Sequence, residues 1–233
     1  MNVGTELITA GGRPIRVFGG DAALTVLQPT GAHEENALAG EFRQITEAGA
    51  DVTLVCVSVT DWDRDLSPWE APPVFGNRPF GSGAADTLRA ITDDCLPALE
   101  AAFPLPGARR YLLCGYSLAG LFALWTSYTS DRFAGAAGVS PSVWFPGWSD
   151  YAASHDEHCR AVYLSLGDRE EKAKNPRLAA VGDCIRAQYA RLFASGVRCT
   201  LEMNPGNHFV DFERRMAKAV VWLAKNAKAD SDL

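Results

Sequence analysis

The sequence of 233 residues lacks several features that would assign a protein to a broad class. It has no apolar run approaching the roughly 18–20 residues that span a bilayer. Its first twelve residues have neither the basic start nor the apolar core of a secretory signal. Lysine and arginine form no cluster, and the formal net charge is −6. We therefore expect neither nucleic acid nor a membrane as a partner.

Motifs for cofactors and metals are also missing. The dinucleotide fingerprint G-x-G-x-x-G does not occur, and no Gly-Lys-Ser/Thr follows the glycines of residues 76–83. His155 and His158 are three residues apart, but the further ligands of a helical zinc site are absent. We expect a protein that needs no metal and no cofactor.

The cysteines do not form the spaced pairs that are typical of a disulfide framework. Three of the six lie in apolar, strand-like runs, where a buried thiol acts as a small hydrophobic group. We expect reduced thiols in a cytoplasmic protein, with a secreted, disulfide-bonded form as the alternative. The cysteines are Cys56, Cys95, Cys114, Cys159, Cys184 and Cys199.

Apolar periodicity alternates between strand and helix along the whole chain. Strands are predicted over residues 14–18, 23–28, 52–59, 110–114, 133–139, 161–166 and 198–203. Helices are predicted over residues 36–48, 84–103, 118–128, 176–194 and 209–225. This order predicts one α/β domain over residues 1–233, with a mainly parallel sheet and helices on both faces. Residues 60–83 and 140–158 are expected to be loops over an active site, because ordinary connections are shorter.

The strongest local motif is Gly115-Tyr116-Ser117-Leu118-Ala119-Gly120, which lies between a predicted strand and a predicted helix. A nucleophile elbow needs this context, because it presents a serine hydroxyl on a sharp turn from strand to helix. Residues two before and two after the serine must be small, and Gly115 and Ala119 are. The motif predicts the α/β-hydrolase fold with Ser117 as nucleophile. The alternative is a glycine-flanked turn with an incidental serine.

A general base and an acid should follow the serine in that fold, with the acid before the histidine. His208 lies in a turn-rich segment after the last predicted strand, at the sheet edge where catalytic groups gather. The preceding strand ends at Gly167 and is followed by carboxylates, of which Asp168 and Glu170 are the candidates for orienting the imidazole. The residues alone leave the choice between these two open, and a solvated charged turn is the alternative for both.

An oxyanion hole requires two backbone donors. The N–H of Leu118 follows the nucleophile, and the loop after the third strand offers the N–H of Ala32. Trp62, Trp69, Trp144 and Trp148 of the expected loops are candidates for the walls of a substrate pocket. We assign Trp62 and Trp144, with Tyr116 of the elbow, to this pocket. Simple packing of the long loops is the alternative.

In five short motifs the chain resembles the esterase D and enterochelin-esterase-like group of α/β-hydrolases, over residues 24–223. The motifs are DRDLSP (63–68), GYSLAG (115–120), GVSPS (138–142), GDRE (167–170) and GNH (206–208). The resemblance implies that the acid stands three residues after the strand-ending glycine, which favours Glu170 over Asp168. It also implies cleavage of carboxylic esters, with substrates that vary widely within the group. Ala119, where the family pattern has glycine, is a departure of one methyl group.

Our first hypothesis is therefore a serine esterase that forms an acyl-enzyme and acts on a small-molecule ester. A thioesterase, peptidase or acyltransferase with the same triad is the second hypothesis, because the pocket sets the leaving group and the acceptor. The third is a hydrolase-fold protein that binds a ligand without turning it over. The sequence leaves the particular ester and the oligomeric state undetermined.

Overall fold

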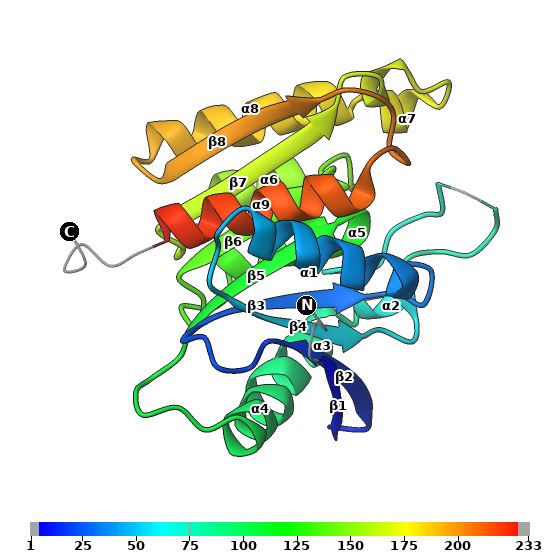
Figure 1. Cartoon of the computed structure of the whole chain (residues 1–233). Helices are drawn as coiled ribbons and strands as arrows, with labels where there is room; N and C mark the ends of the chain where they lie inside the picture. The colour runs from blue at the N-terminus through cyan, green and yellow to red at the C-terminus, as the bar shows by residue number, and fades with distance from the viewer. Residues whose placement is uncertain (1–4, 75, 228–233) are drawn as a thin grey trace.

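A computed structural model describes residues 5–74 and 76–227, which form a layered α/β arrangement around one twisted sheet (Figure 1). The strands are β1 (Thr5–Ala10), β2 (Arg13–Phe18), β3 (Leu24–Thr30), β4 (Thr53–Ser58), β5 (Arg110–Tyr116), β6 (Gly135–Val139), β7 (Ala161–Gly167) and β8 (Arg198–Asn204). Their order is β1-β2-β4-β3-β5-β6-β7-β8. Strands β3 to β8 run parallel to one another, and β2 pairs in an antiparallel manner with both β1 and β4.

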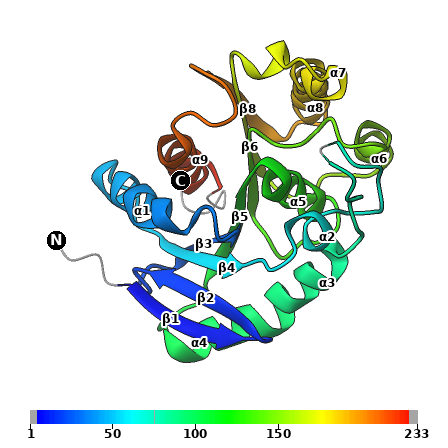
Figure 2. The same ribbon diagram turned by 90° about the vertical axis from the view of Figure 1, so that its right-hand side faces the viewer.

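Helices cover both faces of the sheet. They are α1 (Leu38–Glu47), α2 (Trp62–Asp65), α3 (Ala84–Arg89), α4 (Leu96–Ala102), α5 (Ser117–Ser127), α6 (Trp148–Ser154), α7 (Pro176–Ala179), α8 (Val181–Ala194) and α9 (Phe212–Asn226). Figure 2 shows α1 and α9 on one face, and α3, α4, α5 and α8 on the other. The predicted α/β-hydrolase fold, with its mainly parallel sheet, is confirmed.

Each layer follows from the distribution of apolar residues. The central strands β5 and β7 are buried on both faces, as expected for parallel strands that helices cover on each side. Helix α5 is buried almost all round, because the sheet lies on one side and α6 with the loops on the other. Helices α1 and α9 are amphipathic and bury only the stripe that faces the sheet.

Several predicted elements differ from the structure. An additional strand, β1, forms a hairpin with β2 through Gly11 and Gly12, whose positive φ angles of 56° and 72° suit a tight turn. The predicted helix of residues 84–103 contains a π-helical turn, Ala90–Cys95, between α3 and α4. The last helix begins at Phe212 rather than at Phe209, because Asp211 before it has a left-handed conformation (φ 55°).

The segment 140–158 is not a simple loop over the site. It contains α6, and Trp148 at the start of this helix is fully buried against Tyr128 and Tyr151. Trp69 likewise packs on Tyr151, and its indole N–H donates to the carbonyl of Pro146 at 2.7 Å. The prediction that Trp69 and Trp148 form walls of the substrate pocket is therefore wrong: their side chains pack within the long segments and stabilise them.

Candidate active site

The C-terminal ends of the parallel strands meet at one edge of the sheet, and Ser117 lies there at the junction of β5 and α5. Its φ of 56° is unusual for a residue other than glycine and marks the sharp turn from strand to helix. A Cβ on Gly115 would lie 2.2 Å from the carbonyl oxygen of Ala119, so only glycine fits there. Because Ser117 is the first residue of α5, the N–H of Leu118 belongs to the first turn, where no intrahelical acceptor exists.

His208 lies in the turn between β8 and α9. Its Nε2 atom is 3.1 Å from the Ser117 Oγ, and its Nδ1 atom is 2.7 Å from the Glu170 Oε2. The Tyr116 hydroxyl donates to the His208 carbonyl at 2.8 Å, which fixes the backbone of the turn. The structure therefore brings the serine, the histidine and one of the two candidate carboxylates into one continuous hydrogen-bonded chain.

The two candidate carboxylates have different surroundings. Glu170 is 8% exposed, and its Oε1 accepts hydrogen bonds from the Ser140 hydroxyl at 2.6 Å and from the Gly167 N–H at 2.7 Å. Burial raises the pKa of Glu170, but the hydrogen bonds from His208, Ser140 and Gly167 outweigh it and hold the pKa below its usual value. Asp168 is exposed, and its Oδ1 accepts the Gly206 N–H at 2.9 Å.

Arg215, on α9, is a site residue that the sequence analysis missed. It is 1% exposed, and its Nη1 lies 3.3 Å from Glu170 Oε1 and 3.2 Å from the Tyr116 hydroxyl. Its Nη2 donates to the carbonyls of Pro205 and Asn207 at 2.9 and 3.0 Å. The guanidinium thus joins Glu170 to the turn that carries His208. The signal was present, because Arg215 lies four residues before the buried Ala219, on the same helical face.

Ser140, the other missed residue, follows β6 in the GVSPS motif. It has a positive φ of 45°, and its hydroxyl donates to Glu170 while lying 3.3 Å from Arg215 Nη1. Hydroxyl and guanidinium together satisfy the same oxygen of the carboxylate, which leaves the other oxygen to His208.

The predicted oxyanion residue Ala32 lies in the turn after β3. The Glu34 N–H donates to the Gly31 carbonyl at 3.0 Å, and the Gly31 N–H donates to the Glu34 carboxylate at 3.0 Å. Ala32 is exposed, and the side chains from this turn that line the cavity are those of His33 and Glu34.

A cavity of about 840 Å³ opens beside Ser117. All three predicted pocket residues, Trp62, Tyr116 and Trp144, line it. Leu178 and Val181 add apolar surface, as is typical of small-molecule sites. The cavity can therefore hold an apolar group next to the serine hydroxyl.

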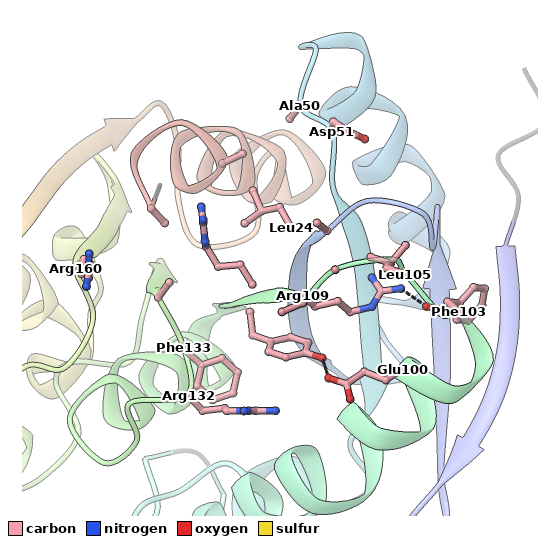
Figure 3. Close-up of a pocket in the computed structure, with 18 of the residues that line it drawn as sticks. Leu24, Ala50, Asp51, Glu100, Phe103, Leu105, Arg109, Arg132, Phe133 and Arg160 are labelled. Atoms are coloured by element: carbon pink, nitrogen blue, oxygen red, sulfur yellow. Dashed lines mark hydrogen bonds between the residues drawn. The ribbon is translucent and has the colours of Figure 1, made fainter. Parts of the chain in front are cut away.

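A second hollow, of about 1270 Å³, lies at the opposite edge of the sheet, where the parallel strands begin (Figure 3). Its Arg109 donates to the carbonyls of Gly20 and Phe103 at 2.8 and 2.7 Å. Arg132 lies 5.4 Å from the centre of the Tyr111 ring. These arginines hold neighbouring segments together, and the candidate nucleophile lies at the other edge.

Other features of the described residues bear on the remaining predictions. The six cysteines are free thiols. Within residues 5–74 and 76–227, no three His, Cys, Asp or Glu side chains are grouped as a metal site would require. The helices in the same ranges include none whose length and apolarity would let it cross a membrane.

Comparisons with known proteins give the family and the fold. A family model described as "Putative esterase" matches residues 26–223. The chain has no match among curated proteins.

The solved structures that are similar to this chain include the following three. The siderophore hydrolase EstA from Aspergillus nidulans is 20% identical with a TM-score of 0.69, and the match covers 96% of this chain and 94% of EstA. An IroE-like serine hydrolase from Shewanella oneidensis is 15% identical with a TM-score of 0.76, and the match covers 100% of this chain and 83% of that hydrolase. The enterobactin esterase FES from Shigella flexneri is 17% identical with a TM-score of 0.68, and the match covers 97% of this chain and 60% of FES. The structures support the fold and the family match covers most of the sequence; the chain therefore belongs to the esterase family and is a carboxylic ester hydrolase with the α/β-hydrolase fold.

Proposed function

We propose that the chain hydrolyses small carboxylic esters through an acyl-enzyme on Ser117, with His208 as general base and Glu170 as the orienting acid. One observation carries the proposal: the hydrogen-bonded chain from the Ser117 Oγ through the His208 ring to the Glu170 carboxylate, beside the cavity. A buried, ionised acid at Nδ1 selects the tautomer whose Nε2 is free to accept the serine proton.

The first half of the reaction forms the acyl-enzyme. The Ser117 Oγ attacks the ester carbonyl carbon while its proton passes to the His208 Nε2. The carbonyl oxygen becomes an oxyanion, which the N–H groups of Leu118 and Ala32 stabilise. The intermediate collapses, the bond to the alcohol oxygen breaks, and His208 returns its proton to that oxygen. The alcohol leaves and the acyl group remains on Ser117.

The second half releases the acid. A water molecule gives a proton to His208 and attacks the acyl carbon. When the second tetrahedral intermediate collapses, His208 returns the proton to the Ser117 Oγ. Glu170 stays ionised throughout, which agrees with its lowered pKa, and stabilises the imidazolium that forms in each half.

The cavity supports a compact substrate. Trp62 and Trp144 line it, and an aromatic or short acyl group suits such walls better than a long lipid chain. One of the similar structures, the enterobactin esterase, is described in the presence of 2,3-dihydroxy-N-benzoyl-glycine, which supports testing esters of aromatic acids. The six free thiols support a cytoplasmic location, which we include in the proposal.

Release of nitrophenolate from p-nitrophenyl acetate and butyrate tests the mechanism. We expect wild-type turnover and a loss of at least about 10³-fold in kcat in Ser117→Ala and His208→Ala, or about 4 kcal/mol of transition-state stabilisation. Ser154→Ala and His155→Ala change the same residue types at exposed positions on or next to α6 and should keep kcat within about 2-fold.

Covalent labelling gives a second test of the nucleophile. A p-nitrophenyl phosphonate should add one phosphonyl group to the wild type, located at Ser117 by peptide mass spectrometry, and none to Ser117→Ala. Ester turnover that survives in Ser117→Ala would refute the proposal. An unlabelled and inactive wild type would favour a protein that only binds its ligand.

A further inference from the structure

Glu34 is a buried carboxyl group at the cavity that the proposed reaction does not use. It is 6% exposed and lines the same cavity as Ser117. Burial raises the pKa of Glu34 to about 7, and the hydrogen bond from the Gly31 N–H opposes the shift only in part. Burying a carboxyl group reduces stability unless it makes compensating contacts, so the contacts of Glu34 indicate its role.

The groups around Glu34 do not form a structural ion-pair network. In the described part of the chain, the one basic side chain within ion-pair distance is the exposed His33, whose Nε2 lies 3.9 Å from Glu34 Oε1. The charge of Glu34 also raises the pKa values of three neighbouring groups, which are Glu41 on α1, Cys56 on β4 and Cys114 on β5. All three are acidic groups, so none of them compensates the charge of Glu34.

Both backbone polar groups of Gly31 bind to Glu34 instead. The Gly31 N–H donates to Glu34 Oε2 at 3.0 Å, and the Gly31 carbonyl accepts the Glu34 N–H at 3.0 Å. That carbonyl shares its peptide plane with the N–H of Ala32, and the two groups of a trans peptide point in opposite directions. Holding the carbonyl toward the Glu34 N–H therefore fixes the direction of the Ala32 N–H.

The same turn is packed tightly against the cavity wall. A Cβ on Gly31 would lie 2.6 Å from the His33 ring and 3.1 Å from the Trp62 ring, and these two rings are 5.0 Å apart. Rotation of the Gly31–Ala32 peptide would have to break the hydrogen bond from the Glu34 N–H, while the Glu34 carboxylate restrains the adjoining Thr30–Gly31 peptide through the Gly31 N–H. A fixed dipole of this kind is what an oxyanion hole needs.

We infer that Glu34 is a positioning residue: its carboxylate holds the Gly31 N–H and thereby fixes the turn in which the Gly31–Ala32 peptide directs the Ala32 N–H at the oxyanion. The inference rests on the proposed function, because it requires an oxyanion formed on attack by Ser117. Glu34 acts through the peptide and does not touch the reacting atoms.

The test compares Glu34→Met, which keeps the length but has no comparable acceptor, with Glu34→Gln, whose amide oxygen can still accept the Gly31 N–H. Glu34→Met should lower kcat for p-nitrophenyl acetate by about 10- to 100-fold, up to the loss of one oxyanion donor, and change KM by less than about 3-fold. Glu34→Gln should restore kcat to within about 3-fold of the wild type. Glu35→Ala removes the neighbouring exposed carboxylate and is the matched control.

A transition-state analogue gives a readout that a structural defect alone would not move selectively. A trifluoromethyl ketone adds to the serine as a tetrahedral oxyanion, and its affinity should fall in Glu34→Met by about the same factor as kcat. Melting temperatures report whether each variant folds, and Glu34→Ala supplies the same readouts if the methionine variant does not.

The outcomes separate this inference from the proposed function. If Ser117→Ala is inactive but Glu34→Met keeps kcat within about 2-fold, the inference fails and the proposed function stands. The inference also fails if kcat and KM deteriorate together in Glu34→Met and Glu34→Gln alike. If Ser117→Ala remains active, both the proposed function and this inference fail.

Discussion

Replacing Arg215 by methionine tests whether one buried cation holds the acid and the histidine turn together. Methionine keeps much of the volume but removes the donors to the carbonyls of Pro205 and Asn207 and the cation beside Glu170. An unsatisfied buried carbonyl costs about 1–3 kcal/mol, and breaking a buried ion pair from one side costs about 3–5 kcal/mol. Because these effects overlap, we expect Arg215→Met to lower the free energy of unfolding by about 3–5 kcal/mol.

Total stabilities are about 5–15 kcal/mol, so the variant should still fold. Its melting temperature should fall by about 6–20 °C, at 2–4 °C per kcal/mol for a chain of this size. Urea unfolding followed by tryptophan fluorescence measures the loss. We also expect kcat for p-nitrophenyl acetate to fall at least about 10-fold, because the 205–208 turn no longer fixes His208 against Glu170. Arg215→Lys keeps the positive charge but lacks the several donors of the planar guanidinium. Its stability and its kcat should therefore lie between those of the wild type and of Arg215→Met. A stability loss below about 1 kcal/mol would refute the assigned role.

Three further predictions follow from single contacts. Glu170→Gln should lower kcat by about 10³–10⁴-fold because it removes the acid at His208, whereas Asp168→Asn, which keeps an acceptor for the Gly206 N–H, should stay within about 3-fold; equal losses in ester turnover would contradict the assignment. Gly115→Ala places a Cβ 2.2 Å from a backbone oxygen and should cost at least about 3 kcal/mol, or prevent folding, as measured by urea unfolding. Burial raises the pKa of Glu41 to about 8, so the native state keeps a proton that the unfolded state releases above about 4.5. The free energy of unfolding should therefore fall as pH rises from 4.5 to 8, by at most about 1.4 kcal/mol per pH unit from this group. Glu41→Gln should flatten the decline of melting temperature with pH. An unchanged decline in this variant would contradict the assignment to Glu41.

The strands that build the core could be predicted from the sequence because they consist of nearly continuous runs of apolar residues. Strand β4 lies within the predicted residues 52–59, and β7 within one residue of the predicted 161–166. The edge hairpin was harder, because β1 is largely exposed and carries no apolar run. Gly11 and Gly12 between two short β-like segments were the available signal.

The proposed nucleophile and base could be recognised from local context that a sequence displays. Ser117 lies between a strand and a helix, and His208 follows the last strand, so their roles were predicted from order alone. The geometry brings the two together at 3.1 Å. The choice between Asp168 and Glu170 was different, because both follow the same strand. Glu170 faces inward through a 3₁₀ turn and a close approach at Gly167, where a Cβ would lie 2.9 Å from Glu170 Oε1.

The supporting residues were not predictable by motif, because their roles depend on contacts across the sheet. Arg215 belongs to a run of charged residues at the start of α9, and it reaches Glu170 on the loop after β7. Glu34 was equally hard to recognise, because it precedes the 3₁₀ turn before α1 and resembles an ordinary acidic residue at the start of a helix. What distinguishes both residues is burial. The spacing of Arg215 from Ala219 was a sequence signal of it, whereas the segment around Glu34 carries none.

Burial of charge provides the physical link between fold and mechanism in this chain. Arg215 and Glu170 are both buried and hydrogen-bonded on several sides, so moving either one requires breaking several contacts at once. Such a frame keeps His208 within hydrogen-bonding distance of Ser117 before substrate arrives, so little reorganisation is needed when charge develops. The same frame loses stability when one member is removed, so residues that do not touch substrate should affect stability and kcat together. Glu34, whose bond is to a backbone N–H and not to a charged partner, should affect kcat far more than stability.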